Sequence, residues 1–256
     1  SARYDFTIAE ADHDKTVSVS AENEEFSASA HLAKVDAETL AAIDGATFEL
    51  FYTPEGSDSE RSLGTLQSGR SYALDATCAG VESSADAEAG KLLVSGLKKG
   101  TYRLVEVSNE GYALPSDKPQ VRWSVGDDDQ GTDIDLADDE HPWTDALIQG
   151  DALVNYPLHG SVTFQKLDED GQGLNGASFK LQVKHGDSWS DVTGGESLET
   201  GFAYTADVTS AGVVGLGGKS ATEAGRITVT NLPWGTYRLV EVEAAAGYVG
   251  KTPDGW

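Results

Sequence analysis

The sequence has few of the residues that hold many extracellular proteins together or anchor them in a bilayer. It contains one cysteine, Cys78, so no disulfide can form within the chain. No apolar run approaches the length that spans a bilayer, and no signal peptide is present. We therefore expect no membrane insertion, and a secreted protein of this kind must be stabilised without disulfides. The abrupt ends, SARYDF and TPDGW, indicate a fragment of a longer protein.

Basic residues are also scarce. The 256 residues include 18 Lys and Arg against 43 Asp and Glu, which gives a net charge of −25. Such a charge repels nucleic acids and anionic membrane surfaces, so neither is expected as a partner.

Metal ligands are not grouped in the sequence. The histidines are scattered, at positions 13, 31, 141, 159 and 185. The acidic loop that begins at Asp168 has Phe179 at the twelfth position, where a calcium-binding EF-hand loop needs a carboxylate. We expect no metal and no cofactor, and we interpret the acidic loops as solvated. Cys78 has no glutamine at a persuasive position for a thioester, and we interpret it as a small buried or loop residue.

Short alternating segments separated by turn residues are abundant. SASAHLAKVD places Leu32 and Lys34 on one face of a strand, and GSVTFQKLD does the same for Phe164 and Lys166. Each is followed by a second apolar strand, IDGATFELF or LNGASFKLQ. Only 39% of residues are hydrophobic, and glycine, serine and threonine are common. This composition favours antiparallel sheets with one wet face.

The segment GTYRLVEV occurs twice, at residues 100–107 and 235–242, and a Gly-Tyr pair follows each copy. In each copy the tyrosine, the leucine and the glutamate (Glu106 or Glu241) share the apolar face of the expected strand. The order of lysine strand, Gly-Ala-x-Phe strand and Tyr-Arg-Leu-x-Glu strand is the same both times. The chain is therefore predicted to contain two homologous β-units.

A strand with an asparagine precedes each lysine. Lys166 follows Asn155 at the same spacing at which Lys34 follows Asn23, and Val17 and Val19 would share a strand face with Asn23. Each asparagine is interpreted as closing one unit before the next opens. The expected divisions are 1–24 for the closing strands of a preceding unit, 25–157 for a first domain, and 158–256 for a second domain that lacks its last strands. Three polar, Gly-rich segments (TCAGVESSADAEAG, VGDDDQGTDIDLADDEHPWTD and the stretch 193–225) are interpreted as long loops or extra hairpins.

These segments resemble the Cna-B (SpaA-type) domains of Gram-positive surface proteins and pilins. The resemblance covers nearly the whole chain and implies tandem immunoglobulin-like β-sandwiches with long loop insertions. In the family, the Tyr-Arg-Leu-x-Glu strand carries a glutamate that promotes a spontaneous Lys–Asn isopeptide bond. The resemblance thus implies that Glu106 promotes a bond between Lys34 and Asn155, and that Glu241 acts on Lys166.

The residue chemistry agrees with this role. Burial lowers the pKa of a lysine and raises that of a glutamate, so a neutral amine and a protonated carboxyl become accessible. The neutral amine is a nucleophile, and the acid can hydrogen-bond the asparagine carbonyl and shuttle protons. The plainer alternative is an ordinary buried salt bridge between Lys34 and Glu106. For Lys166 the acceptor is absent downstream, and two readings are equally open: Asn23 of another molecule supplies it in a head-to-tail contact, or residues 1–24 pack on their own first domain.

The expected function is structural: a stalk or spacer of a cell-wall-anchored, extracellular adhesin or pilin. Its partners would be further Cna-B-like domains of the same polypeptide, with possible head-to-tail self-association through residues 1–24. The crosslink is a single-turnover reaction, so the protein is not expected to be an enzyme. The alternative is an adhesin whose insertions, at residues 126–145 or 193–225, bind host matrix protein or glycan.

Overall fold

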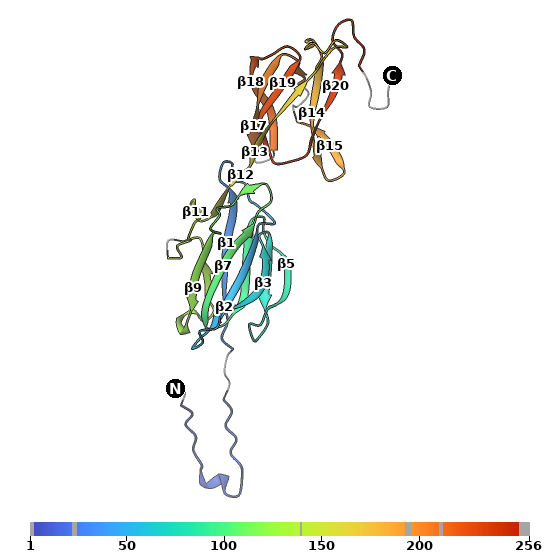
Figure 1. Ribbon diagram of the computed structural model, residues 1–256. Coiled ribbons are helices and arrows are strands. Elements are labelled where there is room, and N and C mark those ends of the chain that lie inside the picture. Colours follow the sequence, from blue (N-terminus) through green and yellow to red (C-terminus); the bar gives the residue numbers. More distant parts are fainter. Residues whose placement is uncertain (1–2, 22–24, 139, 193–195, 210–211, 251–256) are drawn as a thin grey trace.

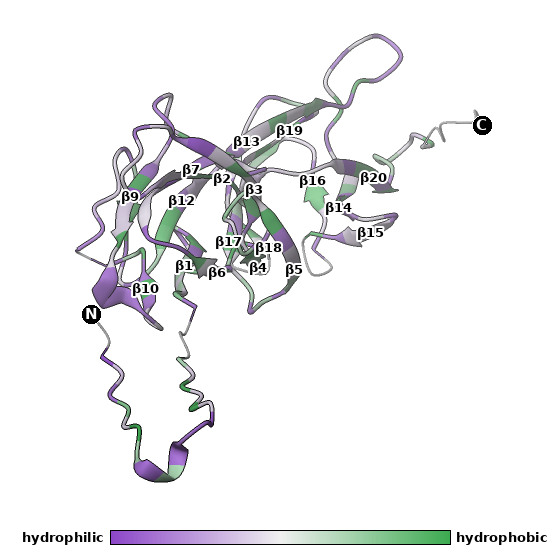
Figure 2. Ribbon diagram, turned by 90° about the horizontal axis from the view of Figure 1, so that it is seen from below, coloured by the Kyte–Doolittle hydropathy of each residue, from purple (hydrophilic) through white to green (hydrophobic). Residues whose placement is uncertain are grey.

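The computed structural model describes residues 3–21, 25–138, 140–192, 196–209 and 212–250 (Figure 1). Two β-sandwiches follow one another along the chain, and an extended N-terminal segment leaves the first sandwich at the end opposite the second (Figure 1). Figure 2 shows apolar and polar residues mixed along the strands of both. Helical structure in the described residues is limited to two 3-10 turns, η1 (Glu10–Asp12) and η2 (Asp127–Asp129). The predicted all-β, tandem immunoglobulin-like architecture is confirmed.

The first sandwich consists of two packed sheets. The larger has the strand order β11-β12-β1-β6-β4-β5, with β10 also paired to β1 and β8 to β12. Its strands are β1 (Ala28–Asp36), β4 (Arg70–Leu74), β5 (Val81–Asp86), β6 (Lys91–Leu97), β8 (Tyr112–Ala113), β10 (Asp133–Asp135), β11 (Leu147–Ile148) and β12 (Leu153–Pro157). The smaller sheet has the order β3-β2-β7-β9, made of β2 (Thr47–Pro54), β3 (Arg61–Gln67), β7 (Gly100–Ser108) and β9 (Gln120–Val125).

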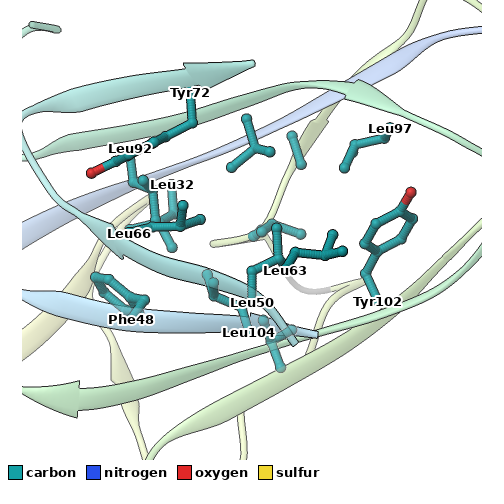
Figure 3. Close-up of a cluster of buried hydrophobic side chains, with 14 of the residues drawn as sticks. Leu32, Phe48, Leu50, Leu63, Leu66, Tyr72, Leu92, Leu97, Tyr102 and Leu104 are labelled. Carbon is teal, nitrogen blue, oxygen red and sulfur yellow. The ribbon is translucent and has the colours of Figure 1, made fainter. Parts of the chain in front are cut away.

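The expected alternation in these strands is present. Every second residue of β1 is buried, and Leu32 and Lys34 both lie on the inner face. Phe48 and Leu50 of β2 are fully buried, and Figure 3 shows them with Leu32 between the two sheets. Such burial of apolar side chains contributes roughly 1.5–3 kcal/mol for each one.

The second sandwich repeats this plan with fewer strands. One sheet has the order β13-β19-β17-β18, made of β13 (His159–Gln165), β17 (Phe202–Thr209), β18 (Gly212–Ala221) and β19 (Arg226–Pro233). The other contains β14 (Ser178–His185), β15 (Ser188–Asp191), β16 (Leu198–Glu199) and β20 (Tyr237–Glu243). Strands β13, β14 and β20 correspond to β1, β2 and β7. Phe179 and Leu181 share the inner face of β14, as the alternation predicts.

The two sandwiches differ at one edge. In the first, β9 pairs with β7 and β12 pairs with β1. In the second, β20 pairs only with β14 and β13 only with β19 among the described residues. The edge of the second sandwich between β13 and β20 is therefore open.

The prediction that residues 193–225 form a long loop or an extra hairpin is only partly right. Strands β17 and β18 do form a hairpin, but β17 also pairs in parallel with β19 and buries Tyr204 and Ala206 in the core. It occupies the place of β4, whose Tyr72 makes the same hydroxyl contact to a backbone N–H five residues earlier in the chain. The glycine and threonine content hid a core strand with few large apolar residues.

The strand expected around Val17 and Val19 is not present. Among residues 3–21 the only regular element is η1, and nearly every side chain there is exposed, including Phe6 at 65%. The alternating pattern finds no sheet within this chain to pair with, and an isolated strand pair is not stable in water.

Candidate functional site

Three strands bring together the lysine, the glutamate and the asparagine of the first sandwich. β1 and β12 run in parallel, with Lys34 opposite Leu153 and Asp36 opposite Asn155. Glu106 lies on β7 in the facing sheet, opposite Phe48, next to a bulge in the β2–β7 ladder. The first and last strands of this unit therefore lie side by side.

The three side chains form a closed polar cluster inside the sandwich. Lys34 and Glu106 have no exposed side-chain surface, and Asn155 is 5% exposed. Asn155 Nδ2 donates a hydrogen bond of 2.6 Å to Glu106 Oε1. Lys34 Nζ lies 3.5 Å from Glu106 Oε2, and neither atom has another partner among the described residues. The glutamate thus touches both of the groups that would be joined.

Burial dominates the electrostatics of this cluster. It lowers the pKa of the Lys34 amine to about 8, although the carboxylate of Glu106 opposes the shift. It also raises the pKa of Glu106, against the opposing effects of Lys34 and Asn155. Both shifts favour the uncharged forms, a neutral amine and a protonated carboxyl. A buried lysine and glutamate held this way are candidates for a functional site rather than for a stabilising ion pair.

One detail differs from expectation. The carboxyl of Glu106 was expected to hydrogen-bond the side-chain carbonyl of Asn155, whereas the structure places the amide nitrogen against it. This arrangement puts the carboxyl beside the nitrogen that would leave, where it can supply a proton to departing ammonia.

The backbone of each lysine is fixed by a glycine contact that the sequence reasoning missed. Lys34 donates its N–H to the carbonyl of Gly90, and the N–H of Gly90 binds the side chain of Asp44. Gly90 has φ +74, and a Cβ there would lie 2.6 Å from the Lys34 carbonyl oxygen. The second sandwich repeats these contacts with Gly225 and Asn175. The repeated pairs EAGK/EAGR and IDGA/LNGA carry the signal from which this contact could have been found.

A second missed contact holds the end of β12. Asp36 is buried, and its carboxylate accepts a hydrogen bond of 3.0 Å from the hydroxyl of Tyr112. Burial, together with Asp36, raises the pKa of Tyr112 to about 12, so this hydroxyl keeps its proton. The carbonyl of Asn155 accepts from the N–H of Ala37. These contacts fix the position of Asn155 along β1.

The second sandwich has the lysine and the glutamate without the asparagine. Lys166 Nζ lies 2.9 Å from Glu241 Oε1, and the two side chains are 21% and 19% exposed. The same bulge adjoins the glutamate, because Glu241 pairs with Phe179 as Glu106 pairs with Phe48. Lys166 also lines an open hollow together with Asp168 and Tyr248. Asn23, the predicted acceptor, lies outside the described residues.

Cys78 behaves as its plainer interpretation, a small buried residue, predicted. Cys78 is buried, and its sulfur contacts the Tyr102 hydroxyl at 3.5 Å. Within the described ranges, no three His, Cys, Asp or Glu side chains gather as a metal site. No helix in that part of the chain has the length and apolarity to cross a membrane.

The fold and the site define a tandem of structural β-sandwiches, the first of which brings a lysine, a glutamate and an asparagine together in a buried cluster. The family model for the SpaA prealbumin-like fold domain matches twice, at residues 28–140 and 160–254. The chain belongs to this family, as the sequence resemblance predicted. SpaA-type domains are structural and non-enzymatic, in agreement with the prediction that the protein is not an enzyme.

The solved structures that match this chain share little sequence identity with it. A streptococcal ancillary pilin matches with 21% identity and a TM-score of 0.34 over 96% of this chain and 62% of that one. The TIE protein of Bacillus anthracis matches with 17% identity and a TM-score of 0.44 over 88% of this chain and 29% of that one. The C-terminal domain of the shaft pilin SpaA of Lactobacillus rhamnosus GG matches with 17% identity and a TM-score of 0.26 over 52% of this chain and 98% of that one. The chain thus spans less than two thirds of the first two. No curated protein matches.

Proposed function

We propose that this chain is a stalk or spacer module whose first sandwich is locked by an isopeptide bond between Lys34 and Asn155. The observation that carries this proposal is the buried cluster in which Glu106 contacts both partners. An unreacted cluster would keep a lysine and a glutamate buried with an incomplete set of hydrogen bonds, which is costly. The bond converts the lysine into a neutral amide and removes that cost.

The step balances within the cluster. The neutral amine of Lys34 attacks Cγ of Asn155, a C–N bond forms, and the bond from Cγ to Nδ2 breaks. Glu106 gives its proton to the leaving nitrogen and regains one from the attacking amine, so ammonia departs and the carboxyl ends as it began. Asn155 also lines an open pocket of about 300 Å³ beside Pro119 and Val154, which gives the ammonia a route to solvent. The fixed strand pair supplies the positioning.

Intact mass spectrometry of the denatured chain tests the bond directly. The wild-type mass should be lower than the sequence mass by one ammonia, and Glu106→Gln should restore the full value because the proton carrier is lost. Glu241→Gln is the matched control from the other copy of the same segment, and it should leave the wild-type deficit unchanged. A wild-type chain at its full sequence mass would overturn the proposal. Circular dichroism checks that Glu106→Gln still folds.

We propose the domain limits 25–157 and 158–256, which are supported by two separate hydrophobic cores. Residues 1–24 are proposed as closing strands, of a preceding unit or of another molecule's second domain. Asn23 as an acceptor for Lys166 stays a prediction from sequence spacing alone. A ladder of covalent multimers on a denaturing gel, abolished by Lys166→Met, would support it.

A stalk role on the surface of a Gram-positive cell wall, in a pilin or adhesin, is supported by the family and by the load path. The chain enters the first sandwich through β1 and leaves through the adjacent β12, so pulling on the ends loads this strand pair. A covalent tie between the two strands would carry that load. The junction to the second sandwich is short. The N–H of Leu158 donates a hydrogen bond to the carbonyl of Gly111, and the N–H of Trp234 donates one to the carbonyl of Leu158.

The alternative is an adhesin that binds host matrix protein or glycan through its insertions. Val214 on β18 is an exposed hydrophobic residue within one of these insertions, so β18 is the place to test for such binding. Deleting residues 193–225 would remove the core strand β17, so the sharper test is Val214→Asp in the intact chain. Binding to an array of matrix proteins and glycans that this change removes would support an adhesin; an array without binding supports a spacer.

A further inference from the structure

The open edge of the second sandwich exposes its core as a groove. The groove has a volume of about 760 Å³ and lies between β13 and β20, lined by apolar side chains that include Val162, Phe164, Tyr237 and Leu239. In the first sandwich β9 covers β7, the counterpart of β20, while β10 and β12 pair with successive parts of β1, the counterpart of β13. Val162 is 37% exposed, whereas Ala30, which precedes its lysine at the same spacing, is 1% exposed. A second hollow beside Lys166 continues the same edge.

The N-terminal segment carries two stretches that match the missing strands. Its first arm, residues 3–8, presents Tyr4, Phe6 and Ile8 at alternate positions, as β9 does with Val121, Trp123 and Val125. Its second arm, residues 15–21, presents Val17 and Val19. The arms run in opposite directions on either side of η1, and both include apolar stretches (Figures 1 and 2). β9 and β12 likewise run in opposite directions, because β9 is antiparallel to β7 and β12 is parallel to β1.

We propose that residues 3–21 of one copy complete the second sandwich of another copy, with the first arm beside β20 and the second arm beside β13. The register of the first sandwich transfers directly. Trp123 stands opposite Tyr102 and stacks on it at 5.3 Å between ring centroids. Phe6 takes the corresponding place opposite Tyr237. Backbone pairing supplies affinity and the alternate apolar side chains supply register, as in other strand additions.

The arms cannot reach the groove of their own chain. In the proposed arrangement the second arm runs parallel to β13, so its end at Ala21 would lie near Lys166. From Ala28, at the start of β1, that place lies beyond the full lengths of β1 and β13. Those two strands together span more than about 50 Å. Ala21 is seven residues from the start of β1 at Ala28, a reach of at most about 25 Å. The segment also projects from the far end of the first sandwich (Figure 1). A second copy can supply both arms, and a head-to-tail contact of this kind extends into an open chain of molecules.

Sedimentation velocity of the 256-residue chain over a wide concentration range tests this inference. The wild type should form a series of oligomers that grows with concentration. Phe6→Asp removes the donor, and Val162→Arg blocks the acceptor; both residues are exposed, so each variant should fold and sediment as a monomer. Thr7→Asp is the matched control, because it places the same charge on the outward face of the first arm and should assemble as the wild type does.

Mixing the two monomeric variants is the decisive experiment. Val162→Arg keeps its arms and Phe6→Asp keeps its groove, so the mixture should form dimers that do not grow further. A wild type that stays monomeric at every concentration, or a Phe6→Asp variant that assembles like the wild type, would overturn the proposal. The inference goes beyond the proposed crosslink and is independent of it, because Glu106→Gln leaves both the arms and the groove intact and should assemble normally.

Discussion

Glu106 and Glu241 stand in the same eight-residue segment, yet their surroundings differ. Both adjoin a bulge opposite a phenylalanine, and both face a lysine. The Glu106 side chain has no exposed surface, while that of Glu241 is 19% exposed. The difference comes from β9 and β12, which cover one pair and have no counterpart beside the other. The neighbouring strands, rather than the segment itself, therefore determine that the first pair is fully buried.

The rate of bond formation in the first sandwich should have a bell-shaped dependence on pH. The reactive form has a neutral Lys34 and a protonated Glu106, so the pair must hold one proton between its two groups. The pair loses that proton as pH rises through about 8, the lowered pKa of Lys34. The pair gains a second proton as pH falls through the raised pKa of Glu106. Refolding denatured, unbonded chains at a series of pH values and following the loss of ammonia by mass measures the profile. A rate that keeps rising above about pH 8 would contradict a role for the protonated carboxyl.

The turn before β6 determines where the lysine of β1 lies. Gly90→Ala and Gly131→Ala place a side chain at nearly the same positive φ, +74 and +75, so both pay about 1–2 kcal/mol of backbone strain. Only at Gly90 would the new Cβ approach the Lys34 carbonyl, at 2.6 Å, while Gly131 has open space. Gly90→Ala should therefore lose about 1–3 kcal/mol more in the free energy of unfolding. It should also slow the bond, as measured by denaturant titration and by the mass time course. Equal effects of the two substitutions would show that Gly90 does not position the lysine.

Strand faces and the proximity of Lys34, Glu106 and Asn155 were predictable from sequence, because period-two burial and an internal repeat both constrain them. Lys34 and Glu106 were placed on inner faces on that basis, and they are buried. The sheet role of β17 was not predictable from composition, since its contribution to the core is small and its pairing with β19 is long-range. The alternation near Val19 predicted a strand that the described chain does not form, because a strand needs a neighbour.

The molecule contains two hydrophobic cores, and its own strands enclose the first more completely than the second. The first core is bounded on all sides by its own strands, and the proposed bond closes a loop of about 120 residues within it. By analogy with disulfides, such a closure stabilises by about 4–5 kcal/mol through the unfolded state. The second core is open between β13 and β20. Unfolding should therefore occur in two separate steps, with the second sandwich opening first.

Cys78 provides a reporter for the first sandwich alone. It is the single cysteine of the chain and is buried against Tyr102, so a thiol reagent should reach it only when that sandwich opens. Asn155→Ala removes the bond and leaves Lys34 and Glu106 buried without their third partner. Labelling of Cys78 should then occur at a clearly lower denaturant concentration, with a loss of at least about 4 kcal/mol in the free energy of opening. Glu241→Gln should leave the labelling midpoint of Cys78 unchanged, because it acts on the other core. If Asn155→Ala and the wild type label at the same midpoint, the first sandwich gains no stability from a Lys34–Asn155 tie.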